Sequence, residues 1–206
     1  MIEVDIGTCK VDYDLSKGNT ILDVKLHVYD AYGIFHDSIK KILKNGKKAM
    51  LRTKIEESDN IAILWEKQYH EHPLHMCAYT NNVKGIRFWI TQGVNPDIRN
   101  NYGQTPLMQG CYYGNIDAIT ELLHLGADVT LKTRFNETVL HFLCYFGEWN
   151  ENTEEILRLL LANGINIDEQ NADGKTARDL LNYKDKNYNN YYCDYCDYIN
   201  FYQKQF

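Results

Sequence analysis

The chain lacks long apolar runs, and this absence limits where it can reside. No segment approaches the roughly 18 consecutive apolar residues that a membrane-spanning helix needs. Residues 1–10 are acidic and lack the apolar core of a secretory signal. We therefore expect an intracellular, cytoplasmic protein without a membrane partner; a secreted effector without a signal of this kind is the alternative.

Positive charge is also in deficit. The formal net charge of −6 disfavours a protein that binds a phosphate backbone. Apolar residues make up 44% of the chain and charged residues 24%, proportions that favour an ordinary soluble protein of one or two domains. A local basic run is interpreted as the solvated face of a helix; it comprises Lys40, Lys41, Lys44, Lys47 and Lys48.

No compact motif for catalysis or metal binding is present. The sequence contains neither a phosphate-cradling loop nor a metalloprotease motif. Cys193 and Cys196 form a Cys-x-x-Cys without a second pair, whereas a zinc site needs four ligands. His141 lies near Cys144, and His75 near Cys77, but a nucleophile and its base also require an orienting group in a pocket. We expect no catalytic residue, metal or cofactor.

What the sequence does contain is an internal repeat. Leu74, Leu107 and Leu140 are spaced 33 residues apart, and Gly93, Gly126 and Gly164 follow at the same register apart from one longer step. That step indicates a five-residue insertion around Glu148 to Thr153. Cysteines recur in the first helix of successive units, at Cys77, Cys111 and Cys144, and are expected to be buried thiols in a reducing compartment.

Local chemistry predicts a pair of helices in each unit. Thr105 is placed to cap a helix whose first turn tolerates Pro106. Gly126 follows an apolar run at helical spacing and suits the left-handed conformation that ends a helix. Because one pair cannot bury its own apolar face, stability must come from stacking on neighbours.

The best-formed unit runs from Tyr102-Gly-Gln-Thr-Pro-Leu107 to Gly126-Ala-Asp128, and it resembles the ankyrin repeat. Partial signatures stand at Pro73-Leu74-His75 and at Thr138, Leu140 and His141. The resemblance covers about Phe35 to Leu181 and implies a mainly α solenoid of helix pairs with β-turn or hairpin tips. It also implies that His75 and His141 bond the turn of a neighbouring repeat.

The register divides the chain into segments. Residues 1–33 form an extension predicted as a β-hairpin packed on the array, because Ile2 to Ile6 and Val24 to Val28 alternate with polar residues. Residues 34–66 are predicted as an N-terminal capping repeat of two helices broken near Asn45-Gly46. The remaining segments are repeats at 67–99, 100–132 and 133–170, and a C-terminal capping repeat with a closing helix at 171–206.

Aromatic side chains recur where such repeats usually hold partners. The tips carry Tyr69, Tyr102 and Phe135, and the first helices carry Tyr79, Tyr112, Tyr113, Tyr145 and Phe146. Arg99, Lys132 and Arg134 lie beside them and are predicted to pair with acidic groups, while Trp149 either extends the rim or plugs the insertion. We expect a concave binding face; the alternative is that these aromatics only pack on each other between repeats.

The predicted function is a non-enzymatic, monomeric interaction module that binds a protein or peptide as an adaptor or inhibitor. Immunity to a toxin, or capture of a host protein by a pathogen effector or viral mimic, are alternatives that the sequence does not rank. Two other classes, an enzyme and a binder of single-stranded nucleic acid, are less favoured.

Overall fold

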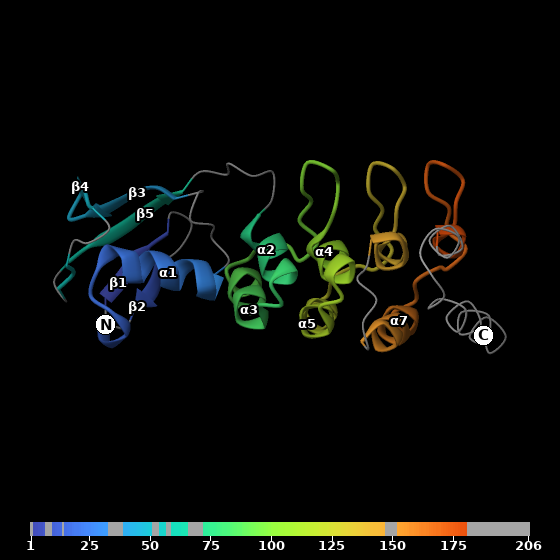
Figure 1. The fold of residues 1–206 in the computed structure, drawn as a ribbon, viewed down its shortest axis with the longest axis horizontal. Helices are drawn as coiled ribbons and strands as arrows, with labels where there is room; N and C mark the ends of the chain where they lie inside the picture. The colour runs from blue at the N-terminus through green and yellow to red at the C-terminus, as the bar shows by residue number, and fades with distance from the viewer. Residues whose placement is uncertain are drawn as a thin grey trace, which may run out of the picture.

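The computed structural model describes residues 2–6, 10–13, 15–32, 39–50, 54–56, 59–65, 72–146 and 152–180. Figure 1 shows two regions in a row. We call residues 2–65 the N-terminal unit, which contains a sheet and a helix, and residues 72–180 the array, which consists of stacked helix pairs. The closing helix predicted beyond residue 180 lies outside the described residues, as does the end of the C-terminal capping repeat.

The N-terminal unit is built on a five-stranded sheet with strand order β2-β1-β5-β3-β4. Its strands are β1 (Ile2–Asp5), β2 (Lys10–Tyr13), β3 (Ile39–Lys44), β4 (Lys47–Lys48) and β5 (Ile61–Trp65). β1 pairs antiparallel with β2 and parallel with β5, which pairs antiparallel with β3. The strand predicted at the N-terminus is therefore present.

The second predicted strand is wrong, because residues 24–28 belong to helix α1 (Ile21–Tyr32), which follows the 3-10 turn η1 (Leu15–Lys17). Ile21, Val24 and Val28 are fully buried at helical spacing, and Leu26 is 41% exposed. Thr20 and Asp23 cap the start: Thr20 N and Oγ1 donate to Asp23 Oδ2, and Asp23 N donates to Thr20 Oγ1. The hydroxyl and amide of Thr20 hold the pKa of Asp23 below its usual value.

The two helices predicted for the capping repeat at 34–66 are also wrong, because the described residues of this stretch form β3, β4 and β5. Asn45 and Gly46 have φ of 52° and 77° and connect β3 to β4 as a tight hairpin. Asn-Gly is the favoured pair for such a turn, because both residues accept positive φ. The run of lysines therefore lies on a β-hairpin instead of a helix face.

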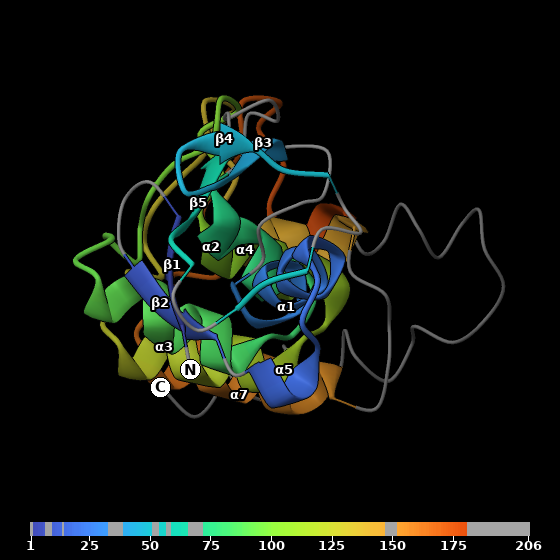
Figure 2. The same ribbon diagram turned by 90° about the vertical axis from the view of Figure 1, so that its left-hand side faces the viewer.

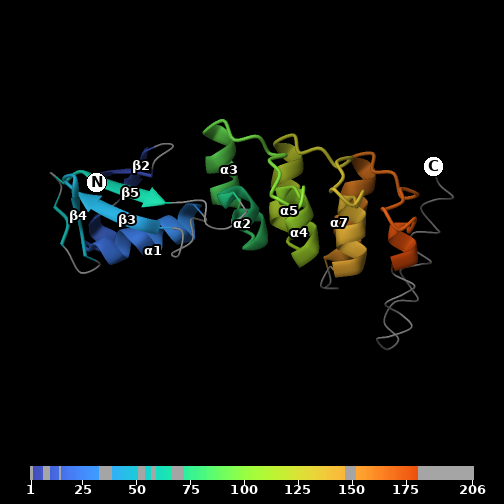
Figure 3. The same ribbon diagram turned by 90° about the horizontal axis from the view of Figure 1, so that it is seen from above.

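Within residues 72–180 the structure describes three complete helix pairs, and residues 177–180 begin a further helix. The three pairs are α2 (Pro73–Tyr79) with α3 (Val83–Thr91), α4 (Pro106–Tyr113) with α5 (Ile116–His124), and α6 (Val139–His141) with α7 (Thr153–Ala162). The π-helical turn η3 (Phe142–Phe146) extends α6. Seen from the side of the tips, the pairs succeed one another along the molecule (Figure 3). Most of the predicted insertion, with Trp149, lies outside the described residues.

The predicted helix signals are confirmed. Thr105 is the N-cap of α4, with its hydroxyl accepting from Met108 N at 3.4 Å and Pro106 in the first turn. Gly126 follows the second helix with φ of 87°. Cys77, Cys111 and Cys144 are fully buried.

Helix α1 covers the end of the array. Its last carbonyls, which have no partner within a helix, are bonded by side chains of the first pair. Trp89 Nε1 donates to Tyr32 O at 2.6 Å, and Asn82 Nδ2 donates to Asp30 O at 2.8 Å. The capping role that the sequence assigned to residues 34–66 is thus filled by a helix from residues 21–32.

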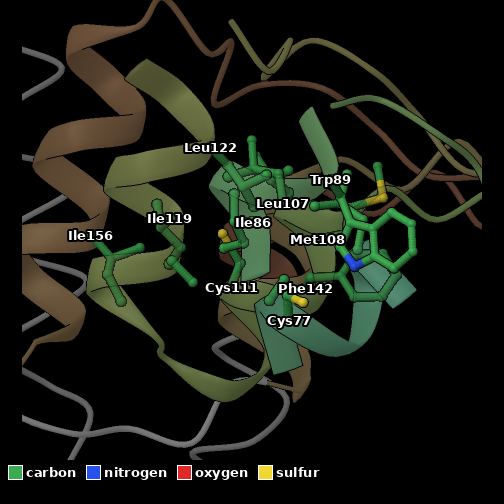
Figure 4. Packing of buried hydrophobic residues seen from close by; sticks show 14 of the residues in the cluster. Cys77, Ile86, Trp89, Leu107, Met108, Cys111, Ile119, Leu122, Phe142 and Ile156 are labelled. Atoms are coloured by element: carbon green, nitrogen blue, oxygen red, sulfur yellow. The ribbon is translucent and has the colours of Figure 1, made fainter. Parts of the chain in front are cut away.

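One apolar core runs through both regions, from Val4 to Ala177. Figure 4 shows how equivalent positions repeat: Ile86, Ile119 and Ile156 come from α3, α5 and α7 and lie in a row. Each is fully buried, so each pair contributes the same side chain to its neighbour's interface. Within the described part of the chain, no helix is long and apolar enough to cross a membrane.

Candidate protein-binding face

The hairpin tips of the array share one local architecture. In each tip an amide or hydroxyl at the first position accepts from backbone amides two and four residues later: Asn100 from Tyr102 and Gln104, Thr133 from Phe135 and Glu137, and Asn171 from Asp173 and Lys175. Successive tips are bonded to each other, since Arg134 N donates to Tyr102 O and Ala172 N donates to Phe135 O. The tips form a continuous, internally bonded edge, visible on one side of the molecule in Figures 1 and 2.

Two aromatic side chains project from this edge. Tyr102 is 57% exposed and Phe135 is 58% exposed, and both occupy the third position of their tips. Gly103 follows Tyr102 with φ of 80°, where a Cβ would lie 3.1 Å from Arg134 N of the next tip. The backbones of the neighbouring tips therefore approach closely at this position. Tyr69, the third predicted tip aromatic, lies outside the described residues.

The aromatics of the first helices do not form a simple row of separate exposed rings. Tyr79, at the end of α2, is 42% exposed, and its ring contacts Tyr113 of the next unit edge-on with centroids 4.4 Å apart. Tyr113 in turn contacts Tyr112 at 4.5 Å, and Tyr112 packs against the core. The alternative of packing between repeats thus holds for the contact of Tyr79 with Tyr113, whereas Tyr112 and Tyr113 are neighbours on α4. Tyr79 also remains partly accessible.

Tyr145 and Phe146 lie in the π-helical turn, and their side chains are not among those described. The face can therefore be described for five of the predicted aromatics, from the first helix of the first unit to the tip of the third. Those five are Tyr79, Tyr102, Tyr112, Tyr113 and Phe135.

The basic residues predicted beside the aromatics serve partly within the array. The Arg99 guanidinium donates to Gly103 O at 3.2 Å and to Lys132 O at 2.6 Å, so it connects two successive units. Lys132 pairs with Glu169, and this ion pair holds the pKa of Glu169 below its usual value. Arg134 is exposed on its tip. All three lie in or beside the tip segments, and the sequence spacing did not reveal the intramolecular bonds of Arg99 and Lys132.

The two signature histidines bond neighbouring tips, as predicted. His75 Nε2 lies 3.0 Å from Gln104 O, and His141 Nε2 lies 3.0 Å from Lys175 O. Thr138 N donates to His141 Nδ1, which leaves the proton on Nε2 to be donated to the carbonyl. Both imidazoles are buried and hold the tip edge on the helices.

Asn81 is a residue that connects units and that sequence reasoning missed. It has φ of 55° at the position where the next unit has Gly114. Its Oδ1 accepts from Ala118 N at 2.9 Å and its Nδ2 donates to Asp117 Oδ2, so it binds the first turn of α5 in the following unit. An asparagine in a glycine position was the available signal, because asparagine tolerates the left-handed conformation.

The described cysteines do not have the properties of catalytic nucleophiles. Burial raises the pKa of the Cys77 thiol to about 12 and also raises that of Cys111, whereas a nucleophilic cysteine needs a lowered pKa. Among the residues that the structure describes, no group of three or more His, Cys, Asp or Glu side chains is placed to hold a metal.

Stacked helix pairs joined by bonded hairpin tips define a helix-hairpin repeat protein. A family model for ankyrin repeats matches residues 30–133 in three copies, half of the 206-residue chain. The chain therefore belongs to the ankyrin repeat family, whose repeats are general protein–protein interaction modules and typically non-enzymatic. No curated protein matches the chain in sequence.

Proposed function

We propose that this chain binds a partner protein along the tip edge, as an adaptor or as an inhibitor that covers its target. The observation that carries the proposal is the pair Tyr102 and Phe135, two aromatic rings more than half exposed at the same position of successive tips. Large exposed aromatics are enriched among the residues that dominate binding energy at interfaces. Arg134, exposed between them in sequence order, adds a planar donor for carboxylates.

Tyr79 extends the proposed face towards the first helices. Its ring is 42% exposed while its other side rests on Tyr113, which fixes its orientation before a partner arrives. A side chain held in place loses little conformational freedom on binding, and this favours affinity. The roles of Tyr69, Tyr145, Phe146 and Trp149 in the same face stay predictions from sequence register.

The test is capture of partners from the native lysate by the wild type and by a Tyr102→Ala, Phe135→Ala variant. These two residues are better choices than Tyr112, because Tyr112 packs on the core and its loss would disturb folding. We expect the double variant to lose a partner that the wild type retains, with a weakening of about 100-fold for two hot-spot aromatics.

A matched control is Leu22→Ala, Leu26→Ala. These leucines are 39% and 41% exposed on α1, so the control also removes exposed apolar area but away from the tip edge. Circular dichroism should show unchanged helicity in both variants. Retention of every partner by the tip variant, or equal loss in the control, would contradict the proposed face.

A further inference from the structure

The β3–β4 hairpin of the N-terminal unit lies on the same side of the molecule as the tip edge. Figure 1 shows both at the same level, and Figure 2, viewed along the array from the N-terminal unit, shows β3 and β4 in front of the tips. A partner that follows the tip edge towards the N-terminal end therefore reaches this hairpin. The hairpin belongs to none of the helix pairs of the array, so the tip architecture does not account for its chemistry.

The hairpin and the segment after it carry more positive than negative charge. Lys47, Lys48 and Lys54 are exposed. Lys44 pairs with Asp59 at 2.7 Å, and among the described residues of this stretch Glu56 is the exposed carboxylate. This local excess stands out in a chain with a net charge of −6.

An exposed apolar side chain lies beside those lysines. Met50, two residues after the end of β4, is 80% exposed. Methionine is flexible and polarizable and adapts to varied apolar partners. The hairpin therefore combines exposed amino groups with an apolar side chain.

The tip edge shows the same combination. Arg99, Arg134 and Lys175 are exposed there beside Tyr102 and Phe135, against Asp173 and the half-buried Glu137. Glu137 Oε2 accepts from Thr133 Oγ1, so part of its bonding capacity is used within the tip. The β3–β4 hairpin and the tip edge, both on one side of the molecule, thus each present exposed cationic groups beside exposed apolar side chains.

We infer that the partner is an acidic protein segment, one that bears carboxylates interspersed with apolar side chains and lies along the tip edge and the β3–β4 hairpin. This inference rests on the proposed function and adds the chemistry of the partner and the N-terminal extension of the face. Carboxylates pair with Lys47, Lys48 and Arg134, and apolar side chains contact Met50, Tyr102 and Phe135. A nucleic acid is disfavoured, because the net charge of the chain is negative and a phosphate backbone gains nothing from Met50.

The first experiment selects binders to the full chain from displayed random peptides of roughly 20 residues, which reach about 60 Å when extended. We expect the enriched peptides to be rich in Asp and Glu with interspersed apolar residues. Enrichment of basic or neutral peptides, or of none, overturns the inference.

The second experiment measures the affinity of one enriched peptide by fluorescence anisotropy. Lys47→Glu, Lys48→Glu should weaken it about tenfold, more at low salt than at high salt, because exposed charge pairs are screened by ions. The control Lys84→Glu, Arg158→Glu changes the net charge equally on α3 and α7 and should leave affinity within about twofold. Both residues are exposed, and Arg158 contributes an i,i+4 pair with Glu154.

These experiments distinguish a failure of the proposed binding face from a failure of the inferred acidic partner. If Tyr102→Ala, Phe135→Ala abolishes peptide binding while Lys47→Glu, Lys48→Glu does not differ from the control, the face stands and the inference is overturned. If the tip variant binds the peptide like the wild type, the proposed function fails. Tighter binding of polyuridylate than of the acidic peptide, lost in the lysine variant, would assign the hairpin to nucleic acid and overturn the inference.

Discussion

The two regions of the molecule are held together by different kinds of contact. In the array, side chains bond one neighbour along the row: His75 reaches Gln104, Asn115 Nδ2 donates to Ala78 O, and Arg87 pairs with Glu121. In the N-terminal unit, β5 lies between β1 and β3 and pairs with both, although some 55 residues of chain separate it from β1. The array gains stability step by step, whereas the N-terminal unit requires its distant strands to assemble together.

The difference explains why the two regions meet at α1. An array that gains stability from neighbours needs its first pair covered, and a cooperative unit that folds as a whole is well suited to cover it. Trp89 and Asn82 of the first pair bond the last carbonyls of α1, so the end of the array and the end of the helix satisfy each other. The comparison predicts that changes at this junction separate the two regions, while changes inside the array loosen only the units concerned.

The largest effect is expected for Trp89→Ala. The indole is 1% exposed, and its loss should cost about 3–5 kcal/mol of unfolding free energy and separate a single urea transition into two. Trp89→Phe keeps much of the apolar contact but loses the bond to Tyr32 O, and should cost about 1 kcal/mol. Circular dichroism in urea measures both; a single transition with an unchanged midpoint for Trp89→Ala would show that the junction is not coupled.

A smaller effect is expected for His141→Ala within the array. The variant removes a buried ring and leaves Lys175 O without its donor, at a cost of about 1–3 kcal/mol. Hydrogen exchange should accelerate first in residues 171–180, which the bond between His141 Nε2 and Lys175 O holds in place, and not in β1 or β5. Uniform acceleration across both regions would contradict step-by-step stability in the array.

Two variants of Asn81 separate the contribution of its side-chain hydrogen bond from that of its left-handed backbone conformation. Asn81→Gly keeps the positive φ and loses the bond to Ala118 N, which should cost about 1 kcal/mol. Asn81→Ala adds the strain of an alanine in the left-handed region and should cost about 1–2 kcal/mol more. Urea midpoints decide the case: equal values for the two variants would mean that backbone conformation does not matter at this position.

The smallest effect concerns the ion pair between Arg87 and Glu121, and it depends on pH. Arg87 Nε and Nη2 each lie 2.7 Å from a Glu121 oxygen, and this pair holds the pKa of Glu121 below its usual 4.5. A lowered folded pKa contributes stability above pH 4.5 that is lost as the pH falls through the folded value. Arg87→Met should therefore destabilise the chain modestly at pH 7, with the difference from wild type shrinking below pH 4.5; a pH-independent difference would contradict it.

The array could be predicted because its determinants are local and repeat. Thr105, Pro106 and Gly126 each act on the helix beside them, and the register carries the prediction to the next unit. The N-terminal unit could not be predicted in this way. The pairing of Val4 with Ile61 joins residues far apart in the sequence, and no short sequence pattern encodes it. Two signals were nonetheless present: the cap formed by Thr20 and Asp23, and the Asn45-Gly46 turn.

Part of the candidate face was predictable for the same reason. Register placed Tyr102 and Phe135 on successive tips, and both are exposed. Which way a long side chain turns depends on the unit next to it. The hydrogen bond of Arg99 to Lys132 O and the ring contact of Tyr79 with Tyr113 could therefore not be inferred from spacing. The chemistry of the β3–β4 hairpin was hidden because its lysines were assigned to a helix.

Each helix pair of the array also contains a buried cysteine that can report local unfolding of that pair. Cys77, Cys111 and Cys144 are one per helix pair and are fully buried, so a thiol reagent can modify each only when its unit opens. The rate of alkylation at each cysteine, followed by mass spectrometry of peptides, would therefore rank the units by how often they open. The native chain thus needs no introduced label to report whether it opens first beside the N-terminal unit or at the far end of the row.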